Sequence, residues 1–375
     1  MTKGGIPTSD FRFPDSEHMR HALRLATRAL GTVAPNPAVG CVIVSSEGRI
    51  LGRGYTQPGG RPHAETVALA QAGATARGAC AYVTLEPCAH HGVTPPCADA
   101  LARAGIARVM GAVIDPDPRV AGGGFARLET AGVTVTRGVL EAEARALNLG
   151  FFKRVMEGRP MVALKVAQSA DGYVADATGN SKWITGERAR AHGHLLRAQH
   201  DAILVGIGTV LADNPALTCR LPGLERRSPI RVVADSHLRT PLTSELVSTA
   251  RERPTILFTT KAGGGEAYLA QGVEIEQLPP DEHGRVDIGG LLRRLGQRGI
   301  TRVLAEGGPA LHASLLQRNL ADVAHIYHAP LLIGEGGKPA IASFGRSELS
   351  AAPHLKLLER VRLGPDLLES FALTV

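Results

Sequence analysis

The sequence has few aromatic residues, few cysteines and no long apolar run, and each shortage excludes a class of protein. No apolar run approaches the ~20 residues that span a bilayer, so we expect no membrane segment. Five cysteines among 375 residues are too few for a disulfide scaffold, and their number is odd. The N-terminus also lacks the apolar core of a secretory signal, and together these features favour a cytoplasmic location.

The chain also lacks any block of lysine or arginine, although its formal net charge is +7. Arginines are spread along the sequence with acidic residues between them, and aromatic residues make up only 4% of the chain. Proteins that bind nucleic acids usually gather basic and aromatic residues on one surface. The charge balance therefore favours a phosphorylated small molecule as the partner, and we expect neither nucleic acid nor a membrane.

Glycine and proline, by contrast, are abundant, at 44 and 24 residues, and they separate alternating helix and strand patterns. A typical domain length of about 150 residues suggests that the chain has two domains. We expect the first domain over residues 13–150, with a first helix from Ser16 to Leu30, and a linker over residues 151–160. A second α/β domain is expected over residues 161–375. The alternation in both parts predicts sheets covered by helices.

Two short motifs in the first half contain candidate zinc ligands. An H-x-E motif holds His63 and Glu65, and the segment EPCAHHGVTPPC holds Cys88 and Cys97. A catalytic zinc ion typically has three protein ligands and a fourth position for water, which His63, Cys88 and Cys97 would satisfy. Glu65 would then be no ligand, but would move a proton from the water to a leaving amine, as in zinc deaminases with the H-x-E…P-C-x-x-C signature.

The spacing of the two cysteines departs from that signature, because eight residues separate them rather than two. The alternative is that Cys88 and Cys97 are small buried side chains without a metal, although both lie in polar, proline-rich sequence. His90 and His91 are competing ligands, but we expect them beside the site or facing the substrate. We assign no role to Cys219.

The wider spacing is the expected pattern of one family. The segments GTVAPNPAVGCVIV, HAE and EPCAHHGVTPPC together resemble the deaminase half of the bifunctional riboflavin-biosynthesis deaminase–reductase family. The resemblance implies a cytidine-deaminase-like, three-layer α/β/α domain that uses Zn²⁺ to deaminate a pyrimidine carrying a phosphoribosylamino group. It also implies that Asn36 contacts the pyrimidine. Val93 stands where the family usually has a basic residue, which leaves one substrate contact unassigned.

Two glycine motifs in the second half are of the kind found at phosphate-binding turns. VGIGTV at 205–210 is a poor dinucleotide motif because it lacks the third glycine. EGGPAL at 306–311 follows an apolar strand pattern, and its paired glycines would let backbone N–H groups approach a phosphate. An ordinary tight turn is the alternative interpretation of the second motif.

The second half also resembles the reductase half of the same family, through KVAQSADG at 165–172, SKWITG at 181–186, RAQHDAILVGIGTVLADNPALTCR at 197–220 and AEGGPAL at 305–311. The resemblance implies a dihydrofolate-reductase-like α/β domain that uses NADPH to reduce a ribosyl group to ribityl by hydride delivery to C1′. It places at the cofactor Ala167, Trp183, Thr209, Asp213, Ser236, Gly307 and Gly308. It places at the substrate Ser181, Arg197, Leu217, Arg220 and Glu306.

Several of these residues also have a physical rationale. Arg197 and Arg220 carry permanently charged, planar guanidinium groups, which can bind a substrate phosphate through paired hydrogen bonds. Glu306 suits substrate hydroxyls or an amine. Lys165 is a candidate for polarising the reacting centre, but a lysine at the end of a strand is more often a solvated charge. Trp183 is expected either to stack on the nicotinamide or ribose, or to lie in the core.

The leading hypothesis is therefore a bifunctional enzyme that catalyses two consecutive steps of riboflavin synthesis and yields 5-amino-6-(5-phosphoribitylamino)uracil. A nucleic-acid or nucleoside zinc deaminase with an accessory α/β domain is the first alternative, because it would share the zinc chemistry. A catalytically inactive binding module is the second, and the complete set of zinc-site residues disfavours it. The family also implies a homo-oligomer, either a dimer or a tetramer.

Overall fold

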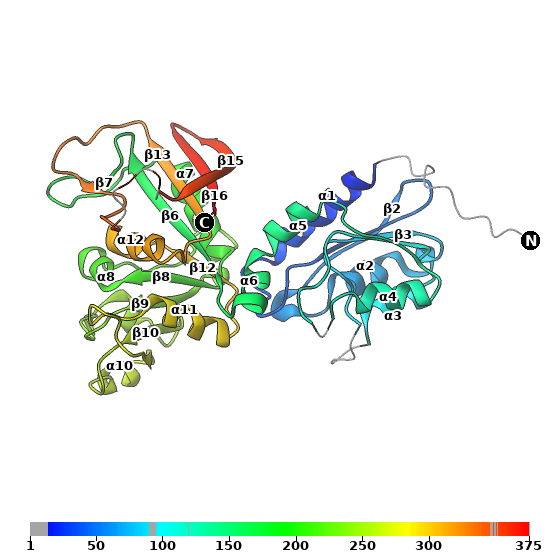
Figure 1. The fold of residues 1–375 in the computed structure, drawn as a ribbon, viewed down its shortest axis with the longest axis horizontal. Coiled ribbons are helices and arrows are strands. Elements are labelled where there is room, and N and C mark those ends of the chain that lie inside the picture. The colour runs from blue at the N-terminus through cyan, green and yellow to red at the C-terminus, as the bar shows by residue number, and fades with distance from the viewer. Residues whose placement is uncertain are drawn as a thin grey trace, which may run out of the picture. The chain divides into compact units, whose positions relative to one another are not determined.

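Two sheets form the framework of the chain, one on each side of a boundary between Glu157 and Gly158 (Figure 1). The computed structural model describes residues 14–89, 95–118, 120–345, 348, 350 and 352–374. Among these residues no helix is long and apolar enough to cross a membrane.

The first unit contains a five-stranded mixed sheet with the strand order β2-β1-β3-β4-β5. Its strands are β1 (Gly40–Val44), β2 (Ile50–Tyr55), β3 (Cys80–Val83), β4 (Arg108–Gly111) and β5 (Thr134–Thr136). Its α-helices are α1 (Asp15–Ala26), α2 (Ala64–Ala72), α3 (Cys97–Arg103), α4 (Gly123–Thr130), α5 (Glu141–Leu147) and α6 (Leu149–Glu157). Helices α1 and α5 cover one face of the sheet, and α2, α3 and α4 cover the other, which makes three layers (Figure 1).

Two glycines let helices pack closely on the two faces of this sheet. A Cβ atom at Gly40 would collide with the Ala22 carbonyl group of α1, and one at Gly54 would collide with the Ala64 carbonyl group of α2. Gly40 pairs with Tyr55, so Gly54, as the preceding residue, faces the opposite side. The close approach at Gly54 fixes the first turn of α2 against β2.

The segment expected to be a linker, residues 151–160, is mostly helical. Helix α5 ends at Leu147, and α6 then covers Leu149–Glu157. Phe152 of α6 is only 6% exposed and belongs to the apolar core of the first unit. Helix α6 therefore extends the first unit, and the division between the units lies directly after the helix, between Glu157 and Gly158.

The second unit contains a nine-stranded sheet with the order β11-β10-β9-β8-β12-β6-β13-β16-β15, and a two-stranded sheet of β14 and β7. Its strands are β6 (Met161–Ser169), β7 (Tyr173–Ala175), β8 (Ala202–Gly206), β9 (Ile230–Ala234), β10 (Thr255–Thr259), β11 (Glu274–Gln277), β12 (Arg302–Ala305), β13 (Val323–Ala329), β14 (Lys338–Pro339), β15 (His354–Leu363) and β16 (Asp366–Thr374). Its α-helices are α7 (Glu187–Ala198), α8 (Ile207–Asp213), α9 (Glu245–Ser248), α10 (Glu266–Ala270), α11 (Ile288–Gln297) and α12 (Pro309–Gln317).

Helices cover both faces of the large sheet, and its parallel strands end at a common edge. Strand residue Leu204 packs in a cluster with Leu292 of α11, whereas the next residue, Val205, packs in a cluster with Leu246 of α9. The seven strands from β11 to β13 in the sheet order run parallel, and β16 and β15 extend them antiparallel. In open parallel sheets, ligands bind outside the carboxyl ends of the strands.

Candidate metal centre and reductase site

The first candidate site forms where helices α2 and α3 begin. His63 is the residue that precedes the first turn of α2, and Cys97 is the first residue of α3. Cys88 lies in the segment between β3 and α3, and its Sγ accepts a hydrogen bond of 3.3 Å from the backbone N–H of Cys97. The fold therefore brings together three side chains that are up to 34 residues apart in the sequence.

The donor atoms of this cluster fit a zinc ion. His63 Nδ1 lies 3.7 Å from Cys88 Sγ and 3.3 Å from Cys97 Sγ. A tetrahedral zinc ion with Zn–S of about 2.3 Å and Zn–N of about 2.0–2.1 Å would separate sulfur from nitrogen by about 3.6 Å. All three donor atoms lie within 4.8 Å of one another, and no other such group occurs in the part of the chain that the structure describes. Two thiols and one imidazole are a donor set that zinc prefers.

The surroundings of the cluster favour the thiolate form of Cys88, whereas the hydrogen bond to Cys88 and burial raise the pKa of the Cys97 thiol. Hydrogen bonds from Cys97 and His63 lower the pKa of the Cys88 thiol to about 4. A metal ligand must be deprotonated, so this shift prepares Cys88 for metal binding. The alternative in which the cysteines are unrelated small buried residues does not account for the convergence of three donor atoms.

Glu65 lies in the first turn of α2, beside the three ligands but outside their donor group. It is only 3% exposed, and burial raises the pKa of its carboxyl group to about 7. A carboxyl group whose pKa is near neutral can both accept and release a proton at physiological pH. The geometry therefore agrees with a proton-transfer role for Glu65.

Asn36, the expected pyrimidine contact, lies in the turn between α1 and β1. Asn148, which the sequence motifs did not indicate, holds this turn in place. Asn148, between α5 and α6, is 3% exposed. Its Oδ1 accepts a hydrogen bond from the N–H of Ala38, and its Nδ2 donates one to the carbonyl oxygen of Ala38, both at 2.9 Å. A Cβ atom at Gly60 would collide with the Asn36 side chain, so Gly60 provides its space.

Three other positions discussed for this site, His90, His91 and Val93, lie outside the described residues.

The second candidate site contains a buried ion pair. Arg197 of α7 donates from Nε and Nη2 to the two carboxylate oxygens of Glu306, each at 2.8 Å. Burial alone would raise the pKa of Glu306, but the charges of Arg197 and Lys165 outweigh it and lower that pKa to about 2. Lys165 Nζ lies 3.9 Å from Glu306 Oε2 and 5.7 Å from the ring centre of Tyr327. The sequence motifs indicated the three charged residues, but not Tyr327.

The strand ends expected to contact the cofactor do lie at one edge of the sheet. Gly308 precedes the first turn of α12 and donates its N–H to Thr209 Oγ1 at 3.1 Å. A Cβ atom at Gly307 would collide with Leu311, so the turn requires a glycine there. Ser236 follows β9, and its Oγ accepts a hydrogen bond of 3.0 Å from Val286. A helix N-terminus beside a glycine pair is a favourable place for a phosphate group.

The remaining expected reductase residues differ in exposure. Trp183 is 66% exposed, with the guanidinium carbon of Arg190 4.7 Å from its ring centre, so a core role for this tryptophan is wrong. The other positions are Ala167, two residues after Lys165 on β6, the half-buried Ser181, the exposed Asp213 at the end of α8, the buried Leu217 and the exposed Arg220. Arg220 adjoins a histidine that the motifs did not indicate, because its N–H lies 3.3 Å from His194 Nδ1.

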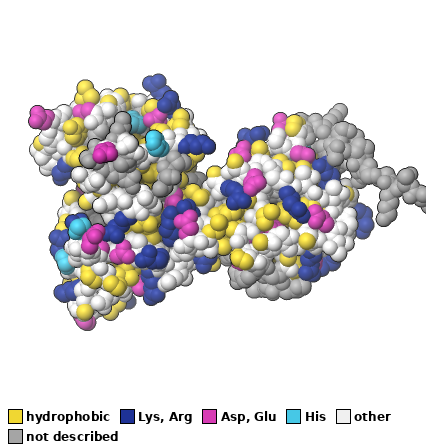
Figure 2. All heavy atoms as spheres, in the orientation of Figure 1, with side chains coloured by type: hydrophobic (Ala, Val, Ile, Leu, Met, Phe, Trp, Pro, Cys, Tyr) yellow, Lys and Arg dark blue, Asp and Glu magenta, His cyan; other side chains and the backbone are white. Residues whose placement is uncertain are grey.

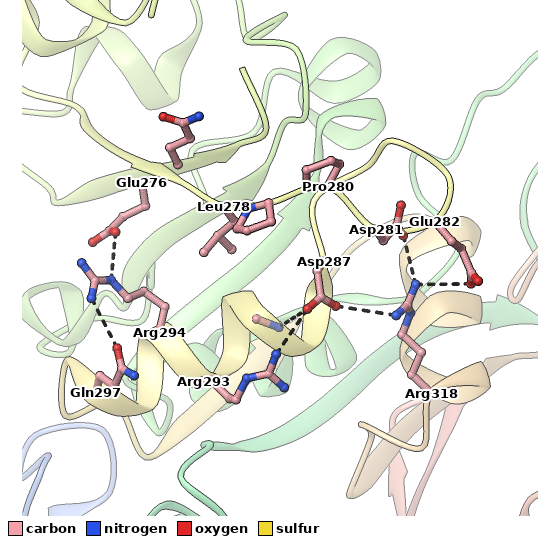
Figure 3. A pocket seen from close by; sticks show the side chains of 13 residues that line it. Glu276, Leu278, Pro280, Asp281, Glu282, Asp287, Arg293, Arg294, Gln297 and Arg318 are labelled. Atoms are coloured by element: carbon pink, nitrogen blue, oxygen red, sulfur yellow. Dashed lines mark hydrogen bonds and ion pairs between the residues drawn. The ribbon is translucent and has the colours of Figure 1, made fainter. Parts of the chain in front are cut away.

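A hollow of about 720 Å³ beside β11 and α11 contains none of the expected site residues (Figure 3). Its charged side chains pair with one another. Arg294 Nε lies 3.0 Å from a Glu276 carboxylate oxygen, and Arg318 Nη2 lies 3.0 Å from Asp281 Oδ2. On the face that Figure 2 shows, basic and acidic side chains are likewise interspersed, which agrees with the charge pattern of the sequence.

Comparisons with known proteins find similarity over nearly the whole chain. Residues 13–113 match the cytidine and deoxycytidylate deaminase zinc-binding region, and residues 160–368 match the RibD C-terminal domain. Riboflavin biosynthesis protein RibD of Escherichia coli (strain K12) is 43% identical over 361 residues, which are 94% of this chain and 97% of that protein. The RibD structure of Acinetobacter baumannii, form 1, has a TM-score of 0.85 at 38% identity, and the match covers 96% of this chain and 99% of that one.

A third relative is a Thermotoga maritima structure described as a diaminohydroxyphosphoribosylaminopyrimidine deaminase/5-amino-6-(5-phosphoribosylamino)uracil reductase. Its TM-score is 0.84 at 35% identity, with 96% of this chain and 99% of that chain covered. Together, these similarities confirm the two expected fold classes, a cytidine-deaminase-like domain followed by a dihydrofolate-reductase-like domain.

Proposed function

Because the chain belongs to the RibD family and combines the deaminase and reductase of riboflavin biosynthesis, we propose a specific pair of reactions for its two units. The first unit deaminates 2,5-diamino-6-(5-phosphoribosylamino)pyrimidin-4-one. The second unit then reduces the ribosyl side chain with NADPH to give 5-amino-6-(5-phosphoribitylamino)uracil. The observation that carries the proposal is the convergence of His63, Cys88 and Cys97 beside the buried carboxyl group of Glu65.

The deaminase step uses four residues of the first unit. A zinc ion held by His63, Cys88 and Cys97 would supply a Lewis acid that activates the attacking water. Glu65 takes a proton from that water and delivers it to the leaving amine, as its buried position and raised pKa allow. Asn36 binds the pyrimidine, in a turn that Asn148 holds in place.

The reductase step takes place at the carboxyl edge of the second sheet. Bound at this edge, NADPH would supply the hydride that reduces C1′ of the sugar. Thr209, Ser236 and the turn at Gly307–Gly308, where α12 begins, form a polar surface for the cofactor phosphates. Ala167, Trp183 and Asp213 complete the binding site for the cofactor. The side chain of Trp183 is exposed and lies outside the core.

The substrate contacts of the reductase step follow from how the charged groups are already engaged. Arg197 uses Nε, Nη1 and Nη2 in hydrogen bonds to Glu306 and to the Thr218 carbonyl oxygen. We therefore assign the substrate phosphate to the exposed Arg220, with Arg197 holding Glu306 in position. Lys165 and Glu306 face the sugar as a pair of opposite charges, and Ser181 and Leu217 complete the substrate contacts.

The deaminase activity is assigned to residues 13–150 together with helix α6, and the reductase activity to the residues from Gly158 onward. We also propose that the enzyme acts in the cytoplasm as a dimer or tetramer. The low cysteine content supports the location, and the family resemblance supports the assembly.

A product analysis by mass spectrometry tests the two activities separately. The purified chain is incubated with the diaminopyrimidine phosphoriboside, with and without NADPH. Without NADPH we expect only the mass change of hydrolytic deamination, and with NADPH a further gain of two hydrogens. Reduction of the precursor that has not been deaminated, at an equal rate, would contradict the proposed order of steps.

Metal analysis tests the deaminase site by itself. We expect about one zinc ion per chain to co-purify, because the three donors converge on one position. Chelation of the metal should abolish deamination. The NADPH-dependent reduction of the deaminated intermediate should remain unchanged. An active deaminase without metal would exclude the proposed zinc centre.

A further inference from the structure

A buried carboxylate close to the metal cluster has no role in the proposed reactions. Glu86 lies between β3 and Cys88 and is 4% exposed. Its Oε1 accepts hydrogen bonds from the backbone N–H groups of Gly124 at 2.8 Å and Phe125 at 3.2 Å. Its Oε2 accepts two more, from Gly122 at 2.9 Å and Asp115 at 3.2 Å. Four backbone donors thus converge on one side chain.

These bonds replace a cap that helix α4 cannot supply itself. The residue that precedes the first turn of α4 is Gly122, which has no side chain, and the described helix has no acidic residue in its first turn. The N–H groups at the start of a helix need acceptors from outside the helix. Glu86 supplies them across 36 to 39 residues of sequence.

The same contact fixes the backbone that leads into the metal ligand. The N–H of Glu86 donates to the Val113 carbonyl oxygen at 2.9 Å, so both its backbone and its side chain are anchored. A Cβ atom at Gly124 would collide with the Pro87 carbonyl oxygen, so the first turn of α4 lies directly against the peptide group that precedes Cys88. On the other side, the Cys88 carbonyl oxygen accepts a hydrogen bond from Ala98 of α3 at 3.3 Å.

We propose that Glu86 is a positioning residue for the metal centre, which anchors the Pro87–Cys88 backbone to the N-terminus of α4 and thereby sets the position of the Cys88 sulfur. The inference rests on the proposed zinc centre of His63, Cys88 and Cys97. A sulfur that moves by a few tenths of an ångström no longer fits a tetrahedral site with the other two donors. Residues that orient metal ligands typically affect metal affinity by about 10–100-fold.

Metal binding by Glu86→Gln in the full-length protein tests the proposal. Glutamine keeps the shape of the side chain but turns one acceptor into an amide donor that faces backbone N–H groups. We expect the zinc dissociation constant, measured by competition with a chromophoric chelator, to rise by about 10–100-fold. The visible absorption of the Co²⁺-substituted protein should change in position or intensity, because it reports the ligand geometry directly. Glu86→Asp keeps the charge with a shorter reach, and we expect an intermediate loss of affinity.

Glu129→Gln is the matched control, since Glu129 lies on the same helix with a side chain 47% exposed and pairs only with surface Arg137 among the described ion pairs. It should leave zinc affinity and the Co²⁺ spectrum unchanged, and reductase turnover of each variant checks that the second unit is folded.

If Glu86→Gln lowers thermal stability while zinc affinity and the Co²⁺ spectrum stay as in the wild type, Glu86 is only a cap of α4 and the inference is wrong. If the glutamine variant does not fold, the same two measurements on Glu86→Asp decide. Failure of the wild-type chain to bind zinc would instead overturn the metal centre itself.

Discussion

Glu65→Gln is expected to reduce deamination by at least about 10²-fold while zinc content and reductase turnover remain at wild-type levels. The amide has nearly the same shape as the carboxyl group, so the first turn of α2 keeps its packing at this buried position. It cannot accept a proton from water or pass one to a leaving amine. The effect should therefore appear in the turnover number rather than in metal binding, because Glu65 lies outside the donor group of His63, Cys88 and Cys97.

Steady-state deamination, zinc analysis and NADPH oxidation on one preparation distinguish this role from others. Glu47→Gln is a suitable control, because Glu47 forms a surface pair with Arg49 and its side chain is 70% exposed. Wild-type deamination by Glu65→Gln would mean that another group transfers the proton. Loss of zinc together with activity would mean that Glu65 holds the metal cluster, and the proposed mechanism would need a different base.

Local signals in the sequence predicted some elements closely. Helix α2 ends at Ala72, because the glycine that follows it, Gly73, has a positive φ of 55° that other residues rarely adopt. The helix expected from Ser16 to Leu30 starts one residue earlier and ends at Ala26, where a 3-10 turn over Thr27–Ala29 follows. Both results depend on residues within a few positions of the helix end.

The metal cluster could also be predicted, because its chemistry restricts the residue types. The chain has only five cysteines, so few combinations of histidine, cysteine and a nearby carboxylate are possible. The spacing of these residues was therefore informative about the zinc ligands. In the second unit, Thr209 and Gly308 come from separate segments and meet through a hydrogen bond across 99 residues. Only the family resemblance, not a local motif, joined those segments before the structure was known.

Contacts between distant segments explain what the sequence did not reveal. Asn148 and Glu86 form hydrogen bonds with backbone groups. Every residue has a backbone, so a sequence motif does not reveal which backbone group such a side chain binds. Residues 151–160 were expected to form a linker, yet the packing of Phe152 into the core of the first unit makes most of the segment a helix. The antiparallel edge of β15 and β16 was not expected either, since β15 is exposed along most of its length and lacks a buried face.

Glu306→Gln is expected to reduce NADPH-dependent reduction by about 10²-fold or more and to destabilise the second unit, while deamination and zinc content stay unchanged. The Glu306 side chain is 8% exposed and receives both hydrogen bonds of the Arg197 fork. The amide would leave the buried guanidinium without its counter-charge and would place a donor opposite a donor. Breaking a buried pair on one side typically costs about 3–5 kcal/mol, and the 17% exposure of the Arg197 side chain favours the lower end of that range.

The pH dependence of stability separates loss of this charge from a general packing defect. The pKa of Glu306 is lowered from its ordinary value of 4.5 to about 2, so its ion pair contributes fully above pH 4.5 and is lost as the pH falls through about 2. The difference in unfolding free energy between wild type and Glu306→Gln should therefore be constant above pH 4.5 and shrink below it. Hydrogen exchange of the β12 peptide, followed by mass spectrometry, measures this difference for the second unit alone.

Glu274→Gln provides the matched control for that experiment, because Glu274 pairs with Arg298 on the surface of the same unit and its side chain is 51% exposed. A surface pair of this kind contributes little, so we expect reductase turnover and β12 exchange close to wild type. A pH-independent destabilisation by Glu306→Gln would show that packing, rather than the carboxylate charge, holds Arg197. Wild-type reductase turnover in Glu306→Gln would remove Glu306 from the substrate contacts and leave Lys165 and Arg220 as the charged groups of the site.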